Sequence, residues 1–231
     1  MLLIGVAMIL VGLLFKIAAV PFHQWTPDAY QGAPTAVTAF MSTTVKIAAF
    51  GALLRVLYVA FGGLRLDWAP MMWIVAILTM VVGSVIAVTQ SDIKRMLAYS
   101  SVAQAGFIMV GVIATSAAGL SSVLFYLIAY GFTTIGAFAV ISIVRDSSGE
   151  ATHLSKWAGL GKKSPITATV VALFMLSFAG IPLTSGFVSK FAVFTAAAAG
   201  GAVPLVVIGV VASAIAVYFY VRVIMQIGRA S

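Results

Sequence analysis

Charged residues are scarce in this sequence: they make up only 8% of its 231 residues, against roughly 25% in ordinary globular domains. Hydrophobic residues account for 63% of the chain, and its mean hydropathy is +1.18. This composition excludes a soluble enzyme, a disordered protein and a nucleic-acid-binding module, because each of these needs far more charged or polar surface. The sequence therefore predicts an integral membrane protein, with the lipid bilayer as its surroundings.

Cysteine is absent, which excludes disulfide bonds, thiolate zinc sites and Cys-ligated iron–sulfur clusters. The two histidines, His23 and His153, lie too far apart in the sequence to match the spacing of a metal site. We therefore expect no cofactor and no metal in this chain. The net charge of +8 comes from basic residues scattered along an apolar chain rather than clustered, so we expect no nucleic-acid partner.

Long apolar runs are abundant, and their lengths fit helices that cross a bilayer, which need about 20 residues. Strands of a membrane barrel would instead alternate apolar and polar residues over about 10 positions. The predicted fold class is an all-α integral membrane protein with about seven transmembrane helices. Their joints are rich in Pro, Gly, Asp and Lys, and the segments are 2–20, 35–60, 70–89, 96–115, 120–144, 166–198 and 203–226.

Two of these helices are expected to be broken. Pro21 opens the irregular stretch after the first segment, and Gly180 and Pro182 interrupt the sixth, which is too long for one span. Proline removes a helix hydrogen bond and glycine lowers helix stability. Broken backbone at membrane depth is tolerated only inside protein or beside a water-filled cavity. A simple proline kink is the alternative at each place.

Basic residues favour one side of the seven crossings. The opposite side receives Arg65, with Arg55 near its end. The positive-inside rule therefore predicts that the N-terminus lies outside and the C-terminus inside. The residues on the basic side are Lys94, Arg95, Arg145, Lys156, Lys162, Lys163 and Arg229.

Three lysines, in contrast, lie several residues inside apolar segments. Charged groups at membrane depth are costly and usually mark pathways for ions or protons. Burial disfavours the charged form of an amine, so these lysines are candidates for binding and releasing a proton. They are Lys16, Lys46 and Lys190.

Lys46 has the most polar predicted surroundings, because Thr35, Thr38 and Ser42 share its helix face. Hydroxyl groups in membrane helices commonly bond to their own backbone carbonyls, which is the alternative to a polar track. That alternative explains each hydroxyl but not the lysine at the end of the row.

The other candidate residues lie close to the predicted breaks. Lys16 shares a face with Gly5 and Gly12, while Lys190 follows the Gly180 break. His23, just past the first break, is either a proton relay or a structural histidine. Four cations near segment ends are expected to extend to the membrane surface, namely Arg55, Lys94, Arg95 and Arg222.

Three motifs resemble those of the antiporter-like subunits of respiratory complex I, the NADH:quinone oxidoreductase. They are KIAAVPFHQWTPDAYQGAP at 16–34, SDIKRMLAYSS at 91–101 and GIPLTSGFVSK at 180–190, in the family's order. Within the family, the FHQWTPD wording at 22–28 and GAFAVI at 136–141 are most similar to the N-type subunit. The resemblance covers essentially the whole chain.

The resemblance implies an antiporter-like fold of two inverted five-helix repeats, each with one broken helix. It also implies that this chain corresponds to a C-terminal portion starting near the seventh helix, with the first repeat largely missing. Residues 1–60 would then be the end of the first repeat, residues 61–226 the second repeat, and residues 227–231 a tail. The implied location is a bacterial plasma membrane.

The resemblance further implies a proton-translocating membrane subunit whose partners are the other membrane subunits of complex I. NADH, FMN, iron–sulfur clusters and quinone are expected in other subunits. Lys16 would titrate in the cytoplasmic half-channel, Lys46 would connect, and Lys190 would exchange protons with the outer side. Gln104 stands where many relatives have His, and it can hold a water wire but cannot titrate. Two alternatives are a subunit of a multisubunit sodium/proton antiporter and a non-conducting scaffold.

Overall fold

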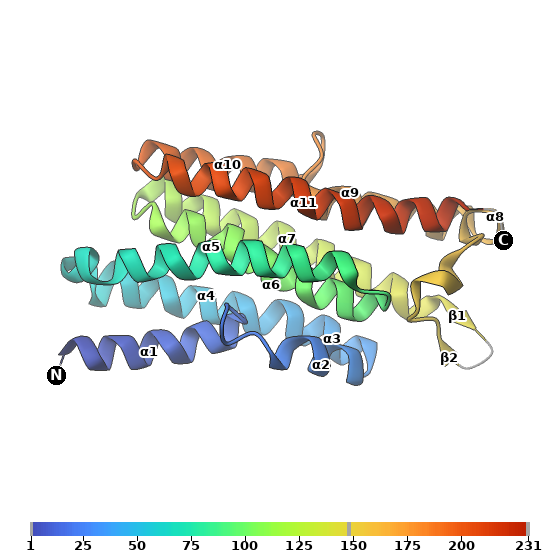
Figure 1. The fold of residues 1–231 in the computed structure, drawn as a ribbon, viewed down its shortest axis with the longest axis horizontal. Helices are drawn as coiled ribbons and strands as arrows, with labels where there is room; N and C mark the ends of the chain where they lie inside the picture. The colour runs from blue at the N-terminus through green and yellow to red at the C-terminus, as the bar shows by residue number, and fades with distance from the viewer. Residues whose placement is uncertain (1, 147–148, 230–231) are drawn as a thin grey trace.

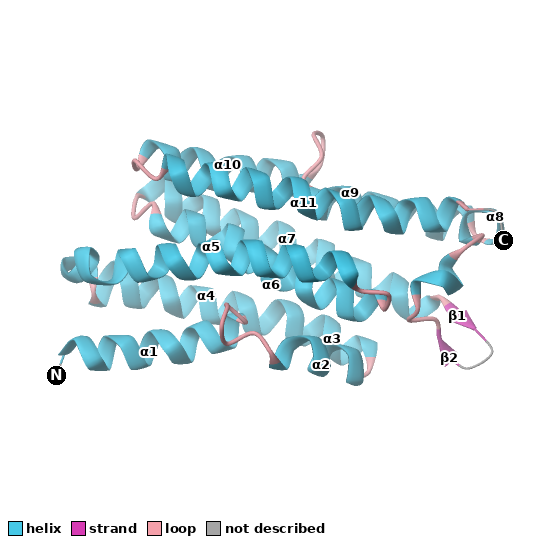
Figure 2. Cartoon of the chain, viewed as in Figure 1, coloured by secondary structure: helices cyan, strands magenta, loops and turns pink. Residues whose placement is uncertain are grey.

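The computed structural model describes residues 2–146 and 149–229, and their helices run alongside one another in an elongated bundle (Figure 1). Figure 2 shows helix almost throughout, with a short pair of strands beyond one end of the bundle. These are β1 (Arg145–Asp146) and β2 (Gly149–Glu150), which pair antiparallel. The predicted all-α class is therefore confirmed.

Seven passes along the bundle can be followed in Figure 1, and consecutive passes run in opposite directions. Among the described residues, five helices are long and apolar enough to cross a membrane, as continuous passes. The two remaining passes are built from pairs of shorter helices. The passes are α1 (Leu2–Ile17) with α2 (Trp25–Gly32); the continuous helix Thr35–Ala60, made of α3 (Thr35–Phe40), a π-helical turn at Met41–Val45, α4 (Lys46–Arg55) and a second π-helical turn at Val56–Ala60; α5 (Arg65–Thr89); α6 (Ile93–Ile113); α7 (Ala117–Ile143); α9 (Pro165–Ala179) with α10 (Ser185–Ala199); and α11 (Val203–Gly228). Short turns lie at Gly62–Leu64, Leu154–Trp157 and α8 (Leu160–Lys163).

Both predicted interruptions are present, and neither is a simple kink. The helix of the first pass stops at Ile17, three residues before the predicted end of the segment, and resumes at Trp25. The backbone of Ala18 turns to a positive φ of 66°, and Val20 N donates a 3.0 Å hydrogen bond to Thr79 Oγ1 of α5. This bond satisfies a backbone group that the broken helix leaves free.

Helix α6 forms the centre of the bundle and is buried on nearly all sides. It packs against α5, α2, α7, α10 and α11. Glycine permits its closest approach to α5: a Cβ on Gly83 would lie 2.6 Å from the Ala103 nitrogen. A Cβ on Gly106 would lie 2.7 Å from the Met80 nitrogen. Small residues at such contacts are typical of helix packing in membranes.

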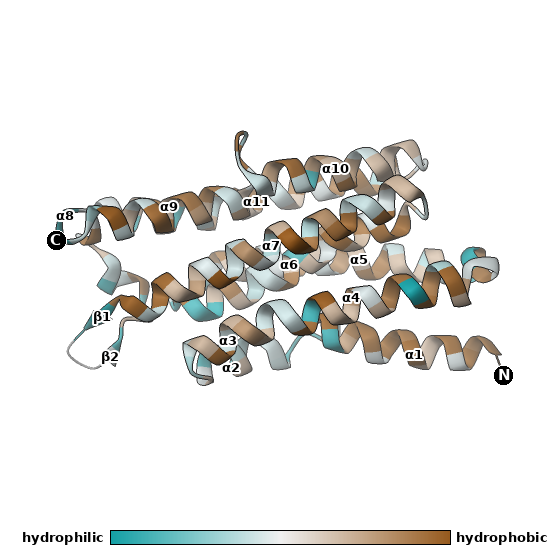
Figure 3. Cartoon of the chain, turned by 180° about the vertical axis from the view of Figure 1, so that it is seen from behind, coloured by the Kyte–Doolittle hydropathy of each residue, from teal (hydrophilic) through white to brown (hydrophobic). Residues whose placement is uncertain are grey.

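The outer faces of the bundle are apolar, as the brown ribbons of α1, α7 and α9 show in Figure 3. Exposed side chains on these faces include Met8, Phe132 and Leu173. In a lipid environment such faces need no polar cover.

The two ends of the bundle differ in charge. The N-terminus and Arg65 lie at one end, while the C-terminus and the β1–β2 hairpin lie at the other (Figure 1). All of the basic residues predicted to share one side fall in connections or helix ends at the hairpin end. We call this the basic end.

Substitution of Gly186 by Ala is expected to disrupt the pairing of α9 with α10. A Cβ on Gly186 would lie 1.7 Å from the Ser177 carbonyl oxygen, so backbone must move. We expect Gly186→Ala to lower the free energy of unfolding by about 1–3 kcal/mol, the usual cost of overpacking. The measurement is an SDS titration followed by circular dichroism.

Gly51→Ala is the matched control, because a Cβ on Gly51 of α4 meets nothing within 4 Å. Equal stability of the two variants would contradict the close approach of α9 and α10.

Candidate functional site

The break between α9 and α10 supplies free backbone carbonyls inside the bundle. Helix α9 ends at Ala179, because Gly180 adopts a left-handed φ of 79°. Thr184 then caps α10, its Oγ1 accepting a 3.3 Å hydrogen bond from Phe187 N. The last carbonyls of any helix have no partner within the helix, and they carry the negative end of its dipole. The break is therefore a site that attracts a cation.

Lys190 of α10 occupies this site. Its Nζ donates hydrogen bonds of 3.0 Å to Phe178 O, to Ala179 O and to Ser213 Oγ of α11. These three acceptors match the three donors of a protonated lysine. Its side chain is buried, and Nζ lies 4.7 Å from the centre of the Phe107 ring.

Gly180 also makes room for this amine, since a Cβ there would lie 3.3 Å from Lys190 Nζ. A cavity of about 270 Å³, lined mostly by apolar side chains such as Phe187 and Val210, adjoins Lys190. The break thus provides acceptors and space for the amine.

Lys46 is the second buried amine, at 2% exposure. It begins α4 directly after a π-helical turn at Met41–Val45, a distortion that is frequent at functional sites. Its Nζ donates to both the carbonyl and the hydroxyl oxygen of Ser101 on α6. The Tyr130 hydroxyl of α7 donates to the same Ser101 Oγ at 2.8 Å.

Gln104 lies one helical turn from Ser101 and connects toward Lys190. Its Nε2 donates to Phe178 O at 3.0 Å, the same carbonyl that accepts from Lys190. Its Oε1 accepts a hydrogen bond from the Tyr126 hydroxyl. Tyr126 and Tyr130 are in turn neighbours on α7, at a spacing of four residues.

A cavity of about 10 Å³, close to the size of one water molecule, lies between these two groups of hydrogen bonds. Tyr130, Gln104, Thr133 and Ser189 are among the residues that line it. The two lysines are thus joined by polar groups, with one short gap at this cavity.

The predicted polar face of the second pass is confirmed in its placement. Thr35, Thr38, Ser42 and Lys46 are all buried. The alternative, that hydroxyl groups bond to carbonyls of their own helix, also holds in part, because Thr38 donates to Pro34 O at 3.3 Å and Ser42 to Ala39 O at 3.0 Å. Thr35 is different, since its hydroxyl donates to a carboxylate.

The structure does not bury Lys16, which is exposed in the last turn of α1. Gly5 and Gly12 lie on the same face of α1, and a Cβ at either position would meet only open space. His23 is half-buried, its ring centre 6.4 Å from that of Tyr99, and its Nδ1 has no hydrogen-bond partner within the described residues. Neither residue is hydrogen-bonded to the Lys46 and Lys190 network as the structure describes it.

One expectation is wrong: Lys94 does not extend to the surface but is buried at 3% exposure. It donates to Ala33 O at 2.7 Å and lies 3.8 Å from Glu150 Oε2. Glu150 comes from the hairpin, more than fifty residues further along the chain, so the local sequence pattern did not reveal the pair.

The sequence did not predict several residues of the network, because they lie on helices other than those of Lys46 and Lys190. Two signals were available: Tyr126 and Tyr130 stand four residues apart in one apolar segment, and Ser100 and Ser101 end the motif at 91–101. Gln104 Nε2 also donates to the Tyr220 hydroxyl at 3.3 Å, and that hydroxyl is hydrogen-bonded to Ser100 Oγ. The residues missed are Ser100, Ser101, Tyr126, Tyr130, Ser213 and Tyr220.

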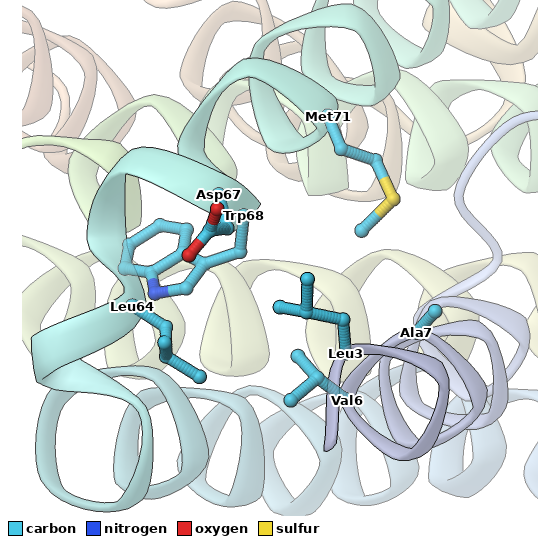
Figure 4. A pocket seen from close by; sticks show the side chains of 7 residues that line it. All are labelled: Leu3, Val6, Ala7, Leu64, Asp67, Trp68 and Met71. Atoms are coloured by element: carbon cyan, nitrogen blue, oxygen red, sulfur yellow. The ribbon is translucent and has the colours of Figure 1, made fainter. Parts of the chain in front are cut away.

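A further pocket, between α1 and α5, is unrelated to these lysines. Figure 4 shows Leu3 and Val6 facing Trp68 and Met71 across it, with the Asp67 carboxylate at its edge. Its volume is about 240 Å³ and no lysine lines it. This volume is close to that of the cavity beside Lys190, about 270 Å³, so volume alone does not identify the functional site.

A family model described as "NADH:quinone oxidoreductase/Mrp antiporter, TM" matches residues 1–216 of the chain. NADH-quinone oxidoreductase subunit N of Rhodococcus opacus is 70% identical over 223 residues, which are 96% of this chain and 41% of the relative. NADH-quinone oxidoreductase subunit N 3 of Streptomyces griseus is 68% identical, over 97% of this chain and 41% of the relative. The chain thus spans about two fifths of the length of these curated relatives.

Solved structures with the same fold include chains from two kinds of assembly. A chain of respiratory complex I from Thermus thermophilus with bound Aureothin has a TM-score of 0.82 and 38% identity, covering 95% of this chain and 48% of that one. A chain of the Mrp complex from Dietzia sp. has a TM-score of 0.91 and 30% identity, covering 99% of this chain and 42% of that one.

Replacing Gln104 by Leu is expected to leave the Tyr126 hydroxyl without its acceptor and to remove one donor to the Phe178 carbonyl. A buried polar group without a partner costs about 1–3 kcal/mol, so we expect a loss of that size in the free energy of unfolding. Gln226→Leu, at a half-exposed position on α11, is the control and is expected to stay within about 0.5 kcal/mol of the parent. If SDS titration finds the two variants equally stable, the Gln104 network is not formed.

Proposed function

Because the chain belongs to the NADH:quinone oxidoreductase/Mrp antiporter membrane family, we propose that it forms part of a proton-translocating subunit of an NADH:quinone oxidoreductase. The observation that carries this proposal is the pair of buried amines: Lys46 is hydrogen-bonded to Ser101 and so to Tyr130, Lys190 shares the Phe178 carbonyl with Gln104, and a water-sized cavity separates Tyr130 from Gln104. The identity to subunits named N supports the N-type assignment.

The environment of the two lysines suits proton transfer. Each amine donates only to carbonyl and hydroxyl oxygens, and neither forms an ion pair among the described residues. A buried ammonium without a counter-charge depends on dipoles for its stability, so a charge that arrives or leaves nearby shifts its protonation. In the proposed mechanism Lys46 passes protons toward Lys190, which exchanges them with the outer side.

Lys16 is proposed to titrate on the cytoplasmic route, as in the resemblance, and its position beside the first break supports this. His23 is proposed as a relay, supported by its unpartnered Nδ1. Gln104 is proposed to hold hydrogen-bonded water rather than to carry the proton itself. We also propose the division into residues 1–60, 61–226 and 227–231, since each of the two larger parts contains one broken helix.

The chain is a multi-pass membrane protein, and its relatives named above are bacterial. We propose a bacterial plasma membrane with the basic end inside, which places the N-terminus outside and the C-terminus inside. The proposed partners are neighbouring membrane subunits of complex I. NADH, FMN, iron–sulfur clusters and quinone would belong to other subunits of the same assembly.

A sodium/proton antiporter subunit is the second candidate function, favoured by the TM-score of 0.91 to a chain of an Mrp complex. The two functions differ in the process that drives proton translocation, which is quinone reduction in one case and sodium exchange in the other. Proton exchange that depends on sodium, in sealed vesicles without NADH or quinone, would support the antiporter and contradict the first proposal.

Loss of either buried amine is expected to stop proton translocation. In the full-length subunit within its complex, we expect Lys46→Met or Lys190→Met to lower proton uptake by about a hundredfold, as for loss of an acid–base group. NADH:quinone turnover is recorded in the same vesicles, because tight coupling would lower both rates together.

Lys163→Met removes an exposed amine at the basic end and serves as the control. Lys16→Ala, measured in the same way, tests the proposed cytoplasmic route. Wild-type uptake by a fully assembled triple variant lacking Lys16, Lys46 and Lys190 would establish the scaffold alternative instead.

A further inference from the structure

The ion pair at the basic end, between buried Lys94 and partly exposed Glu150, has no role in the network described so far. Lys94 Nζ is held by Ala33 O at 2.7 Å and lies 3.8 Å from Glu150 Oε2. The Lys94 side chain is 4% exposed, whereas that of Glu150 is 29% exposed. The carboxylate therefore contacts solvent, and the amine behind it does not.

Glu150 also contacts the interior of the bundle on its other side. The hydroxyl of Thr35, itself only 2% exposed, donates to the same Glu150 Oε2. Thr35 is the first residue of α3, and it begins the row of buried hydroxyls that continues through Thr38 and Ser42 to Lys46. The Glu150 carboxylate thus lies between solvent and the first hydroxyl of this row, that of Thr35.

The backbone holds Glu150 in this place. Ala151 N donates to Val144 O at 3.0 Å, and Ile93 N donates to Thr152 O at 2.8 Å. These bonds fix the residues after the hairpin against the ends of α7 and α6. Glu150 is consequently positioned by its neighbours rather than by its contact with Lys94 alone.

We propose that Glu150 is a proton-entry residue for Lys46 at the basic end, on a route separate from the one through Lys16, with Lys94 balancing its charge. The carboxylate takes a proton from solvent and gives it to the Thr35 hydroxyl, which releases one inward. Each hydroxyl of the row accepts one proton and releases one, until the Lys46 amine becomes an ammonium and Glu150 is a carboxylate again. Side chains three or four residues apart on a helix have Cβ atoms about 5–6 Å apart, so in the proposed route water molecules connect successive hydroxyls.

This inference rests on the proposed function, since it supplies protons to Lys46. The experiment uses the full-length subunit in its intact complex in sealed vesicles, with proton uptake and NADH:quinone turnover recorded together. We expect Glu150→Gln and Glu150→Ala to lower uptake by about tenfold or more. Glu150→Asp, which keeps a titratable group, should recover part of the rate.

Two controls separate proton entry from structure. Asp146→Asn removes the other carboxylate of the hairpin, the one that pairs with Lys156, and should leave uptake unchanged. Added acetate, a small mobile proton donor, should restore NADH:quinone turnover in Glu150→Ala at constant ionic strength, measured in vesicles made permeable to protons so that acetic acid crossing the bilayer has no effect, whereas chloride should not. A purely structural defect would not respond to acetate.

Lys46→Met is measured in parallel so that the two proposals can fail separately. If Lys46→Met stops uptake while assembled Glu150→Gln runs at the wild-type rate, protons enter elsewhere and this inference is overturned. A loss in Glu150→Ala that acetate does not restore also overturns it. If Lys46→Met itself leaves uptake intact, the proposed function is wrong.

Discussion

The break between α9 and α10 is the feature on which the rest of the site depends. An amine inside a bundle of apolar helices needs acceptors, yet an unbroken helix uses its carbonyls in its own hydrogen bonds. By ending at Ala179, α9 releases the carbonyls of residues 178 and 179, and Lys190 binds both. Broken backbone and buried lysine therefore require one another: either alone would leave polar groups without partners.

The same constraint explains how the two lysines are linked. The Phe178 carbonyl accepts from both Lys190 and Gln104, so the helix break also fixes the amide of Gln104. Close packing of α6 against its neighbours, which its small residues permit, brings Ser101 to Lys46 and Gln104 to the break. One central helix thus carries the connection between two amines on different passes.

The sequence predicted those parts of the site that depend on local pattern. Lys46 and Lys190 stood out because charge is costly within apolar segments, and both breaks followed from Pro and Gly. The partners of Lys46 could not be predicted in this way, because Ser101 and Tyr130 face it only through the rotation and packing of α6 and α7.

The burial of Lys94 and the exposure of Lys16 both have physical reasons. Lys94 was assigned to the membrane surface because a cation near a helix end usually extends to water. The burial of Lys94 depends on Glu150, a residue of the hairpin that is distant from Lys94 in the sequence. Lys16 lies within an apolar run, but burial is a property of the surroundings of a helix, and the outer face of α1 is open in this chain.

Gln104 gives the pathway a property that a titratable residue would not. An amide at the midpoint can orient donors and acceptors but cannot store a proton, so a proton crossing from Lys46 to Lys190 has no resting place between them. Charge then sits on one amine or the other. Because the interior screens charge weakly, a proton on one lysine disfavours a second on its neighbour. In the proposed mechanism the two amines therefore act as a coupled pair, and an event that discharges Lys190 favours the refilling of Lys46.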